Sequence, residues 1–167
     1  IQDKTIYFDT EIERLRYLVD NDFYFDVFEK YSEADLQEIT DYAKSIDFRF
    51  ASYMSASKFF KDYALKTNDK TQFLEDYKQH VVIVALYLAN GHKPTARQLI
   101  SAMIEQRYQP ATPTFLNAGR ARRGELVSCF LLEVDDSLNS INFIDSTAKQ
   151  LSKIGGGVAI NLSKLRA

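Results

Sequence analysis

Apolar residues recur at helical spacing in the first part of the chain. Thr10 stands three residues before Glu13, and Ser32 stands three residues before Asp35. A hydroxyl followed by an acid at this distance satisfies the free N–H groups at a helix start. Apolar positions follow each cap at intervals of three and four residues: Ile12, Leu15, Leu18 and Val19 after the first, and Leu36, Ile39, Ala43 and Ile46 after the second. We therefore predict a helix after each cap.

Two more helices are predicted before residue 107. The third runs from about Thr71 to Leu88, where Asn90-Gly91 provides a stop. Pro94 opens the fourth, which carries Leu99, Met103 and Ile104 on its apolar face. Residues 47–69 are rich in aromatic side chains, and we expect an extended segment followed by a short turn of helix there.

The pattern changes after Arg107. Residues 107–124 contain two prolines, two glycines and four arginines, which predicts a long loop or a broken helical connection. Residues 125–134 then form a predicted strand. Its centre, Cys129-Phe130-Leu131-Leu132, is apolar on both faces, as is typical of a parallel strand covered on both sides.

A helix and a second strand follow. Asp136 is predicted to cap the helix, Gly155-Gly156-Gly157 to end it, and residues 158–162 to form the strand. The apolar face of this helix is Leu138, Ile141, Ile144, Ala148 and Leu151. Strand, helix, strand is the order of a parallel crossover unit. One such unit cannot make a stable sheet by itself, so we expect further strands beyond Ala167 or in another chain.

These patterns divide the chain near Gln106. Residues 1–106 are predicted to form a mainly α-helical domain, and residues 107–167 a loop plus the start of an α/β domain. The sequence begins with Ile1 rather than Met and stops directly after a strand pattern. We therefore expect a piece of a longer polypeptide.

Composition narrows the class of protein. The chain is 46% hydrophobic with a formal net charge of -2, which is typical of a soluble globular protein and opposes nucleic-acid or membrane-surface binding by the whole chain. No apolar run approaches the roughly 20 residues of a membrane span. The single cysteine excludes an internal disulfide and indicates a reducing, cytoplasmic compartment.

Cys129 is the first candidate for chemistry. A lone cysteine on an apolar strand is more often an inert core residue than a reactive one. Here, however, Arg120, Arg122 and Arg123 lie just upstream, and they would lower the pKa of the thiol and hold an anionic substrate near it.

Other candidates are weaker when each is taken alone. Thr112, in Ala-Thr-Pro-Thr, offers a hydroxyl suited to phosphate oxygens, although an ordinary turn also explains the motif. Three successive glycines are more than a helix end requires and favour close approach of a ligand or a strand. His80 and His92 have no partner at metal-ligand spacing, so no metal site is predicted.

Four motifs occur in order, and together they resemble the large, catalytic subunit of ribonucleotide reductase. They are Ala111–Gly119 (ATPTFLNAG), Ser128–Leu132 (SCFLL), Asp136–Leu138 (DSL) and Gly155–Arg166 (GGGVAINLSKLR). The motif TPTFLNAG and the short helical N-terminus are more similar to large subunits of class Ib than to those of class Ia. The specific resemblance covers about a third of the chain. It implies that a helical domain precedes the first β-α-β unit of a ten-stranded α/β barrel, truncated in this chain.

The resemblance also implies roles for the motif residues in substrate binding and reduction. Cys129 matches the first cysteine of the redox-active pair that reduces the substrate, and Ser128 matches a serine at the substrate ribose. Thr112 matches a threonine in the diphosphate site. Gly156 and Gly157 match a glycine stretch that lines the pocket.

A second group of residues matches the allosteric specificity site of the family. Asp136, Ser137, Leu138 and Arg166 correspond to residues that bind a deoxynucleoside triphosphate or ATP as the effector. The implied chain binds no cofactor of its own, because a separate metal-containing small subunit supplies the radical. The implied partners are a ribonucleoside diphosphate substrate, that small subunit, a glutaredoxin-like or thioredoxin-like reductant and a second large subunit in a homodimer.

Several of the family's features are absent from residues 1–167. They are the radical cysteine, the second reducing cysteine, the Asn-x-Cys-x-Glu segment and the C-terminal cysteine tail. We therefore predict that this chain alone reduces nothing. Two other readings stay open at this point: a helical interaction module without catalysis, and a phosphate-binding, kinase-like protein, which the absence of a Walker lysine opposes.

Overall fold

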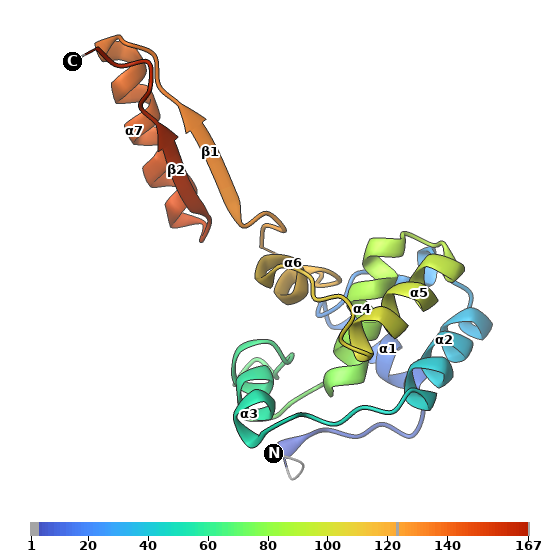
Figure 1. Cartoon of the computed structure of the whole chain (residues 1–167). Helices are drawn as coiled ribbons and strands as arrows, with labels where there is room; N and C mark the ends of the chain where they lie inside the picture. The colour runs from blue at the N-terminus through green and yellow to red at the C-terminus, as the bar shows by residue number, and fades with distance from the viewer. Residues whose placement is uncertain (1–3, 123, 167) are drawn as a thin grey trace. The chain divides into compact units, whose positions relative to one another are not determined.

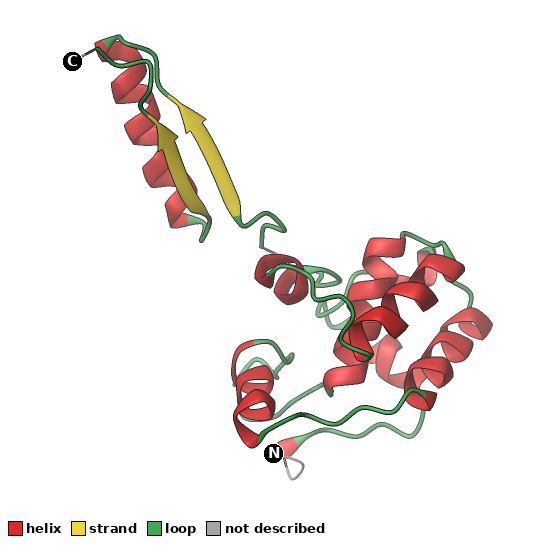
Figure 2. Ribbon diagram, in the orientation of Figure 1, coloured by secondary structure: helices red, strands yellow, loops and turns green. Residues whose placement is uncertain are grey.

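The computed structural model describes residues 4–122 and 124–166, which divide into two compact units. Residues 4–110 and 115–122 form the helical unit, and residues 111–114 and 124–166 form the strand unit. Figure 2 shows helices throughout the first unit and a pair of strands with one helix in the second. Compared with the boundary expected near Gln106, residues 115–122 group with the helices that precede them.

The helical unit is built around α4. Figure 1 shows this helix beside α5 and α2, with α3 reached through a long extended segment. Residues 81–86 of α4 are all buried, and a helix that is apolar on every side belongs in the centre of a core. The elements of the unit are α1 (Glu11–Asp20), the 3-10 helix η2 (Val27–Glu29), α2 (Glu33–Ser45), α3 (Tyr53–Asp62), α4 (Tyr77–Ala89) and α5 (Lys93–Ile104).

Helix caps confirm most of the predicted starts and stops. Thr10 caps α1 and forms a reciprocal capping box with Glu13, and Ser32 accepts a hydrogen bond at the start of α2. Asn90 adopts a left-handed conformation at the end of α4. Pro94 lies in the first turn of α5, as predicted.

The predicted start of α4 is wrong by six residues. The helix begins at Tyr77 because Asp76 forms a capping box with Gln79. Upstream of that cap, Phe73 pairs as an isolated bridge with Thr5 and with Lys66, so this stretch is extended. Helix α3 is also longer than the single turn that we expected, since it runs over ten residues.

The strand unit contains the predicted parallel crossover. Strand β1 (Cys129–Glu133) pairs in parallel with β2 (Gly157–Asn161), and α7 (Leu138–Lys153) connects them. Helix α6 (Thr112–Asn117) interrupts the preceding connection, which is therefore the broken helical connection rather than a continuous loop. The parallel β-α-β order read from the sequence is confirmed.

Two details of the crossover differ from expectation. Ser137, not Asp136, is the cap of α7, because its hydroxyl accepts from the N–H of Ser140 at 3.1 Å. The strands are also less covered than their apolar pattern predicted, and the side chain of Leu131 is 84% exposed. The apolar pattern predicts that other elements pack on the faces of β1 and β2. Such elements are not among the described residues.

Candidate functional site

Ser128 and Cys129 stand at the start of β1, next to the start of β2. The oxygen Oγ of Ser128 lies 3.6 Å from Sγ of Cys129, and the thiol is exposed. Cys129 and Gly157 are register partners across the strand pair. The N–H of Gly157 donates to the carbonyl oxygen of Ser128 at 2.8 Å. The structure therefore brings three of the residues predicted for substrate binding and reduction to one end of the sheet.

Each glycine of the triplet has its own structural reason. Gly155 follows α7 with a φ of +92°, a left-handed conformation that favours glycine. At Gly156 an added methyl group would overlap the ring of Phe130. At Gly157 it would lie 3.4 Å from the carbonyl oxygen of Ser128. The surplus of glycine thus reflects close approach of neighbouring strand residues, one of the two explanations that the sequence favoured.

Thr112 is the first residue of α6, the helix that precedes these strands. Two residues further on, the hydroxyl of Thr114 donates to the carbonyl oxygen of Leu126 at 3.1 Å. Leu126 lies just before Ser128 in the chain, so this hydrogen bond ties the start of α6 to the segment that leads into β1. The hydroxyl proposed for phosphate binding therefore belongs to the same unit as Cys129.

The residues predicted for effector binding gather at the opposite end of the strand pair. Nε of Arg166, just after β2, lies 3.3 Å from Oδ2 of Asp136, just before α7. Ser137 caps α7, and the side chain of Leu138 is 73% exposed. Lys164 completes this end by pairing with Glu133 at 3.0 Å and with Asp135 at 3.3 Å.

Strand β1 therefore joins the two groups of predicted residues. Cys129 is its first residue and Glu133 its last. At about 3.3 Å per residue, the strand separates the two groups by roughly 13 Å.

The arginines expected to act on the thiol have other partners. Arg120 belongs to the helical unit, where Nη2 donates to Oε1 of Glu75 at 2.8 Å and to the carbonyl oxygen of Tyr63 at 3.0 Å. Arg122 pairs with Asp22 at 3.2 Å. The remaining one, Arg123, lies outside the described residues. A buried carboxylate binds the guanidinium of Arg120, so the described structure gives no support to the prediction that this arginine tunes Cys129.

Glu75 is the centre of a buried group of charged residues that the sequence did not reveal, here called the Glu75 cluster: Arg14, Tyr24, Glu75, His80 and Arg120. Tyr24 donates a short hydrogen bond to Oε2 of Glu75. Nδ1 of His80 lies 2.6 Å from Oε1, and Arg14 donates to the Tyr24 hydroxyl at 3.0 Å. The side chains of Glu75 and His80 are fully buried. The only signal in the sequence was a histidine inside the apolar run of α4.

Electrostatics keep Glu75 ionised. Burial by itself would raise the pKa of the Glu75 carboxyl, but the charges of Arg120 and His80 outweigh burial and hold that pKa well below its usual range. Burial raises the pKa of the Tyr24 hydroxyl well above its ordinary value, so it stays a neutral donor. Glu75 is therefore a carboxylate surrounded by donors.

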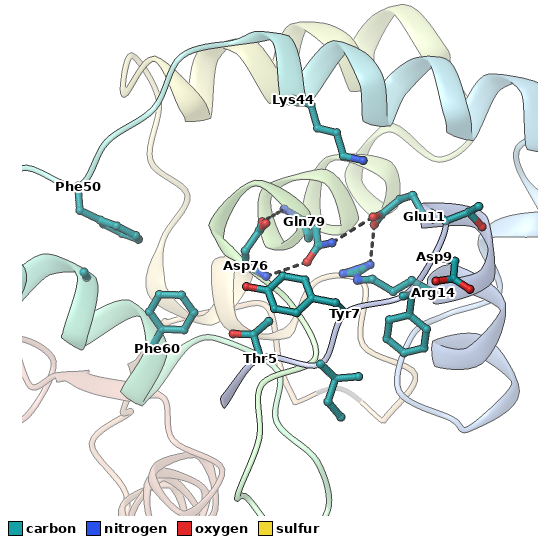
Figure 3. Close-up of a pocket in the computed structure, with 14 residues that line it drawn as sticks. Thr5, Tyr7, Asp9, Glu11, Arg14, Lys44, Phe50, Phe60, Asp76 and Gln79 are labelled. Carbon is teal, nitrogen blue, oxygen red and sulfur yellow. Dashed lines mark hydrogen bonds and ion pairs between the residues drawn. The ribbon is translucent and has the colours of Figure 1, made fainter. Parts of the chain in front are cut away.

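A cavity of about 600 Å³ also lies in the helical unit (Figure 3). It is lined by Tyr7 from the N-terminal segment, by Glu11 and Arg14 from α1, and by Asp76 and Gln79 at the start of α4. Its polar groups pair with one another: Gln79 donates to Glu11 at 3.0 Å, and Arg14 donates to Glu11 at 2.9 Å. No residue predicted from the sequence for substrate or effector binding lines this cavity.

Two negative findings apply to residues 4–122 and 124–166. Within these ranges, no group of three or more His, Cys, Asp or Glu side chains is placed to hold a metal ion. No helix in this part of the chain combines the length and apolar character needed to cross a bilayer.

Family models match three successive parts of the chain. The ribonucleotide reductase N-terminal model matches residues 1–48, the ribonucleotide reductase all-alpha domain matches residues 49–123, and the ribonucleotide reductase barrel domain matches residues 127–167. A helical domain that runs into the parallel β-α-β start of an α/β barrel is thus the architecture of this chain.

Curated relatives agree along the whole sequence. The ribonucleoside-diphosphate reductase subunit alpha of Bacillus subtilis is 55% identical over 100% of this chain, which corresponds to 24% of the relative. The subunit alpha of Mycoplasma genitalium is 48% identical over 99% of the chain and 23% of the relative. The large subunit of vaccinia virus is 28% identical over 85% of the chain and 18% of the relative. The chain belongs to the ribonucleotide reductase large-subunit family, and it spans less than a quarter of the length of these relatives.

Proposed function

We propose that this chain is the N-terminal part of a ribonucleoside-diphosphate reductase large subunit. The full-length subunit then reduces ribonucleoside diphosphates to deoxyribonucleoside diphosphates, the precursors of DNA. The observation that carries the proposal is the placement of Ser128 and Cys129 opposite Gly157 at one end of the parallel strand pair, in a chain of this family. The relatives that cover the whole chain are named as ribonucleoside-diphosphate reductases.

In this proposal Cys129 is one of two thiols that reduce the substrate. A thiyl radical on another cysteine of the full-length subunit abstracts the 3' hydrogen, and the 2' hydroxyl leaves as water. Cys129 and its partner thiol give up two electrons and two protons and become a disulfide. A short strand suits this role, because the sulfur must meet the substrate and the partner thiol within bonding distance.

Nearby residues bind the substrate. The hydroxyl of Ser128 contacts the ribose, and the hydroxyl of Thr112 contacts the diphosphate. Gly156 and Gly157 belong to the glycine stretch that lines the pocket in this proposal. The hydrogen bond between Thr114 and Leu126 supports this arrangement, because it ties the start of α6 to the segment before β1.

Asp136, Ser137, Leu138 and Arg166 form the specificity site in this proposal, and a deoxynucleoside triphosphate or ATP binds there. The pairing of Asp136 with Arg166 supports a common site for residues that lie 30 positions apart in the sequence. Binding at this end of β1 then adjusts the substrate pocket at the other end.

The full-length subunit acts with partners. A separate, metal-containing small subunit supplies the radical, a glutaredoxin-like or thioredoxin-like protein reduces the disulfide, and two large subunits form a homodimer in the cytoplasm. We also propose class Ib, on the wording of residues 112–119. Residues 1–167 contain a single thiol, so this piece alone does not reduce nucleotides.

Replacement of Cys129 in a full-length subunit that carries this sequence tests the proposal. Cys129→Ser is expected to abolish turnover driven by a dithiol, because the disulfide cannot form, and to leave effector binding within about twofold. Deoxynucleotide formation is measured by chromatography and effector affinity by equilibrium binding. Full activity of Cys129→Ala would contradict the proposal and favour a helical interaction module.

A further inference from the structure

Helix α6 depends on other elements for its position. It has six residues, and a helix of that length has little stability of its own. The carbonyl groups of its last four residues lack partners inside the helix. Thr112, the proposed diphosphate ligand, is its first residue, so whatever holds the far end of α6 also sets the direction in which Thr112 is presented.

The Glu75 cluster supplies the missing partners at that far end. Nε2 of His80 lies 2.6 Å from the carbonyl oxygen of Phe115, one helical turn after Thr112. Nε of Arg120 reaches the carbonyl oxygen of Leu116 at 3.5 Å. His80 and the Arg120 guanidinium therefore both lie at the C-terminal end of α6, where the positive charge of Arg120 is favourable.

One ring nitrogen of His80 faces α6 and the other faces Glu75. The Phe115 carbonyl can only accept, so Nε2 carries a proton. Nδ1 lies 2.6 Å from Oε1 of Glu75, and Nη2 of Arg120 lies 3.4 Å from the same nitrogen. The imidazole ring thus connects the buried Glu75 carboxylate in the helical core to the backbone of α6.

The residues after α6 are fixed to the same core. The carbonyl oxygen of Gly119 accepts from the N–H of Phe25 at 3.0 Å, and the N–H of Ala121 donates to Phe23 at 3.1 Å. Gly119 has a φ of +86°, and an added methyl group would lie 2.9 Å from the carbonyl oxygen of Ile83 in α4. The C-terminal end of α6 is therefore held on the same α4 helix that carries His80.

We infer that His80, acting with Glu75, is a positioning residue for substrate binding. Its hydrogen bond to Phe115 fixes α6 so that Thr112 meets the diphosphate of a ribonucleoside diphosphate. This inference rests on the proposed function. It assigns His80 no contact with the substrate, so loss of His80 acts on the binding of the diphosphate and not on the chemical step.

The test uses the full-length subunit with its partners, saturating effector and a ribonucleoside diphosphate as substrate. His80→Leu removes both ring nitrogens and is expected to raise KM about tenfold, the equivalent of about 1.4 kcal/mol, with kcat within twofold. His80→Gln keeps an amide N–H for the Phe115 carbonyl and is expected to hold KM within about threefold of the parent. Effector affinity is expected to stay unchanged in both variants.

Two controls separate positioning from general stability and from the proposed function. Ile39→Ala removes a buried side chain of α2 that does not belong to the Glu75 cluster, and it is expected to lower Tm without changing KM. Thr112→Val is expected to raise KM at least as much as His80→Leu.

Each contrary result has a distinct meaning. A normal KM in both His80 variants, with a raised KM in Thr112→Val, would overturn the positioning role and leave the proposed function standing. A raised KM in Ile39→Ala equal to that of His80→Leu would also overturn it, because KM would then follow stability. A normal KM in Thr112→Val would instead remove the substrate contact on which the proposed function depends. If His80→Leu does not fold, Glu75→Gln takes its place: it is expected to raise KM, and an unchanged KM in that variant overturns the inference.

Discussion

Arg166, five residues after the end of β2, lies with its Nε 3.3 Å from Oδ2 of Asp136 and so holds the loop before α7. The guanidinium is 83% exposed and therefore open to an incoming anion. Lys164 makes a parallel connection from the same segment to Glu133 and Asp135. At this end of the strand pair, carboxylates thus hold the side chains of Lys164 and Arg166 in place.

Asp136→Ala is expected to weaken effector binding about tenfold in the full-length subunit, because Arg166 loses the carboxylate that orients it. Turnover at saturating effector should stay within about twofold, since Cys129 lies at the opposite end of β1. Equilibrium binding of a deoxynucleoside triphosphate and the ratio of products from competing substrates measure the two effects. Asp145→Ala is a matched control on α7, because Asp145 pairs only with Lys149 among the described residues. Unaltered effector affinity in Asp136→Ala would show that the site is misplaced.

Gly156→Ala is expected to disturb the strand pair, because the new methyl group overlaps the Phe130 ring. Overpacking of this kind costs about 1–3 kcal/mol. Faster amide hydrogen exchange across residues 129–133 would report the change. Phe130→Leu in the same chain should restore part of the protection, since the two sites are in contact. In Gly155→Ala the methyl group meets nothing within 4 Å, so only the left-handed backbone is penalised. Equal effects at both glycines would argue against the packing explanation.

Asp76→Ala is expected to destabilise the helical unit by about 1 kcal/mol, because Asp76 caps α4. The sign of the change is informative. If α4 began near Thr71, position 76 would lie inside the helix, and alanine there would stabilise it. Urea unfolding followed by circular dichroism measures the difference. Asp41→Ala, at an exposed position inside α2, should change stability by less than about 0.5 kcal/mol.

Glu75 is expected to make stability depend on acid pH. Its pKa is lower in the folded chain than the ordinary value of 4.5, so its ionised form stabilises the fold fully above that value. This contribution is lost as the pH falls below about 4.5 toward the folded pKa. Glu75→Gln should therefore be less stable than the parent at pH 7 and should show a flatter decline in acid. Urea unfolding across pH 3–7 tests this, with the exposed Glu29→Gln as the control. Parallel curves for Glu75→Gln and the parent would contradict the assigned ionisation.

The features that were predicted correctly depend on interactions between residues close together in the sequence. A cap such as Thr10 needs only Glu13, and Asn90 needs only the glycine that follows it. The parallel crossover was also predictable, because apolar periodicity changes visibly from strand to helix and back. Grouping of Ser128, Cys129 and Gly157 follows from that register once the strands are known.

The features that were missed depend on contacts between distant parts of the chain. Arg120 and Glu75 are 45 residues apart, and nothing near either of them in the sequence indicates their pairing. His80 lacked a partner at metal-ligand spacing, and its bond to a backbone carbonyl leaves no trace in residue types. The start of α4 was predicted wrongly for a similar reason. Phe73 pairs with the distant Thr5, and this pairing keeps the segment before α4 extended.

The exposure of the strand pair also affects how separate molecules associate in solution. In the described chain each strand has a single hydrogen-bonded neighbour, and the side chain of Leu131 is 84% exposed. An open strand edge can recruit the edge of another molecule, and residues 129–133 combine β-forming side chains with an absence of proline and glycine. We therefore expect residues 1–167, expressed alone, to aggregate at high concentration. Growth of its aggregates would begin at β1, where the apolar faces that a complete barrel encloses are open to solvent.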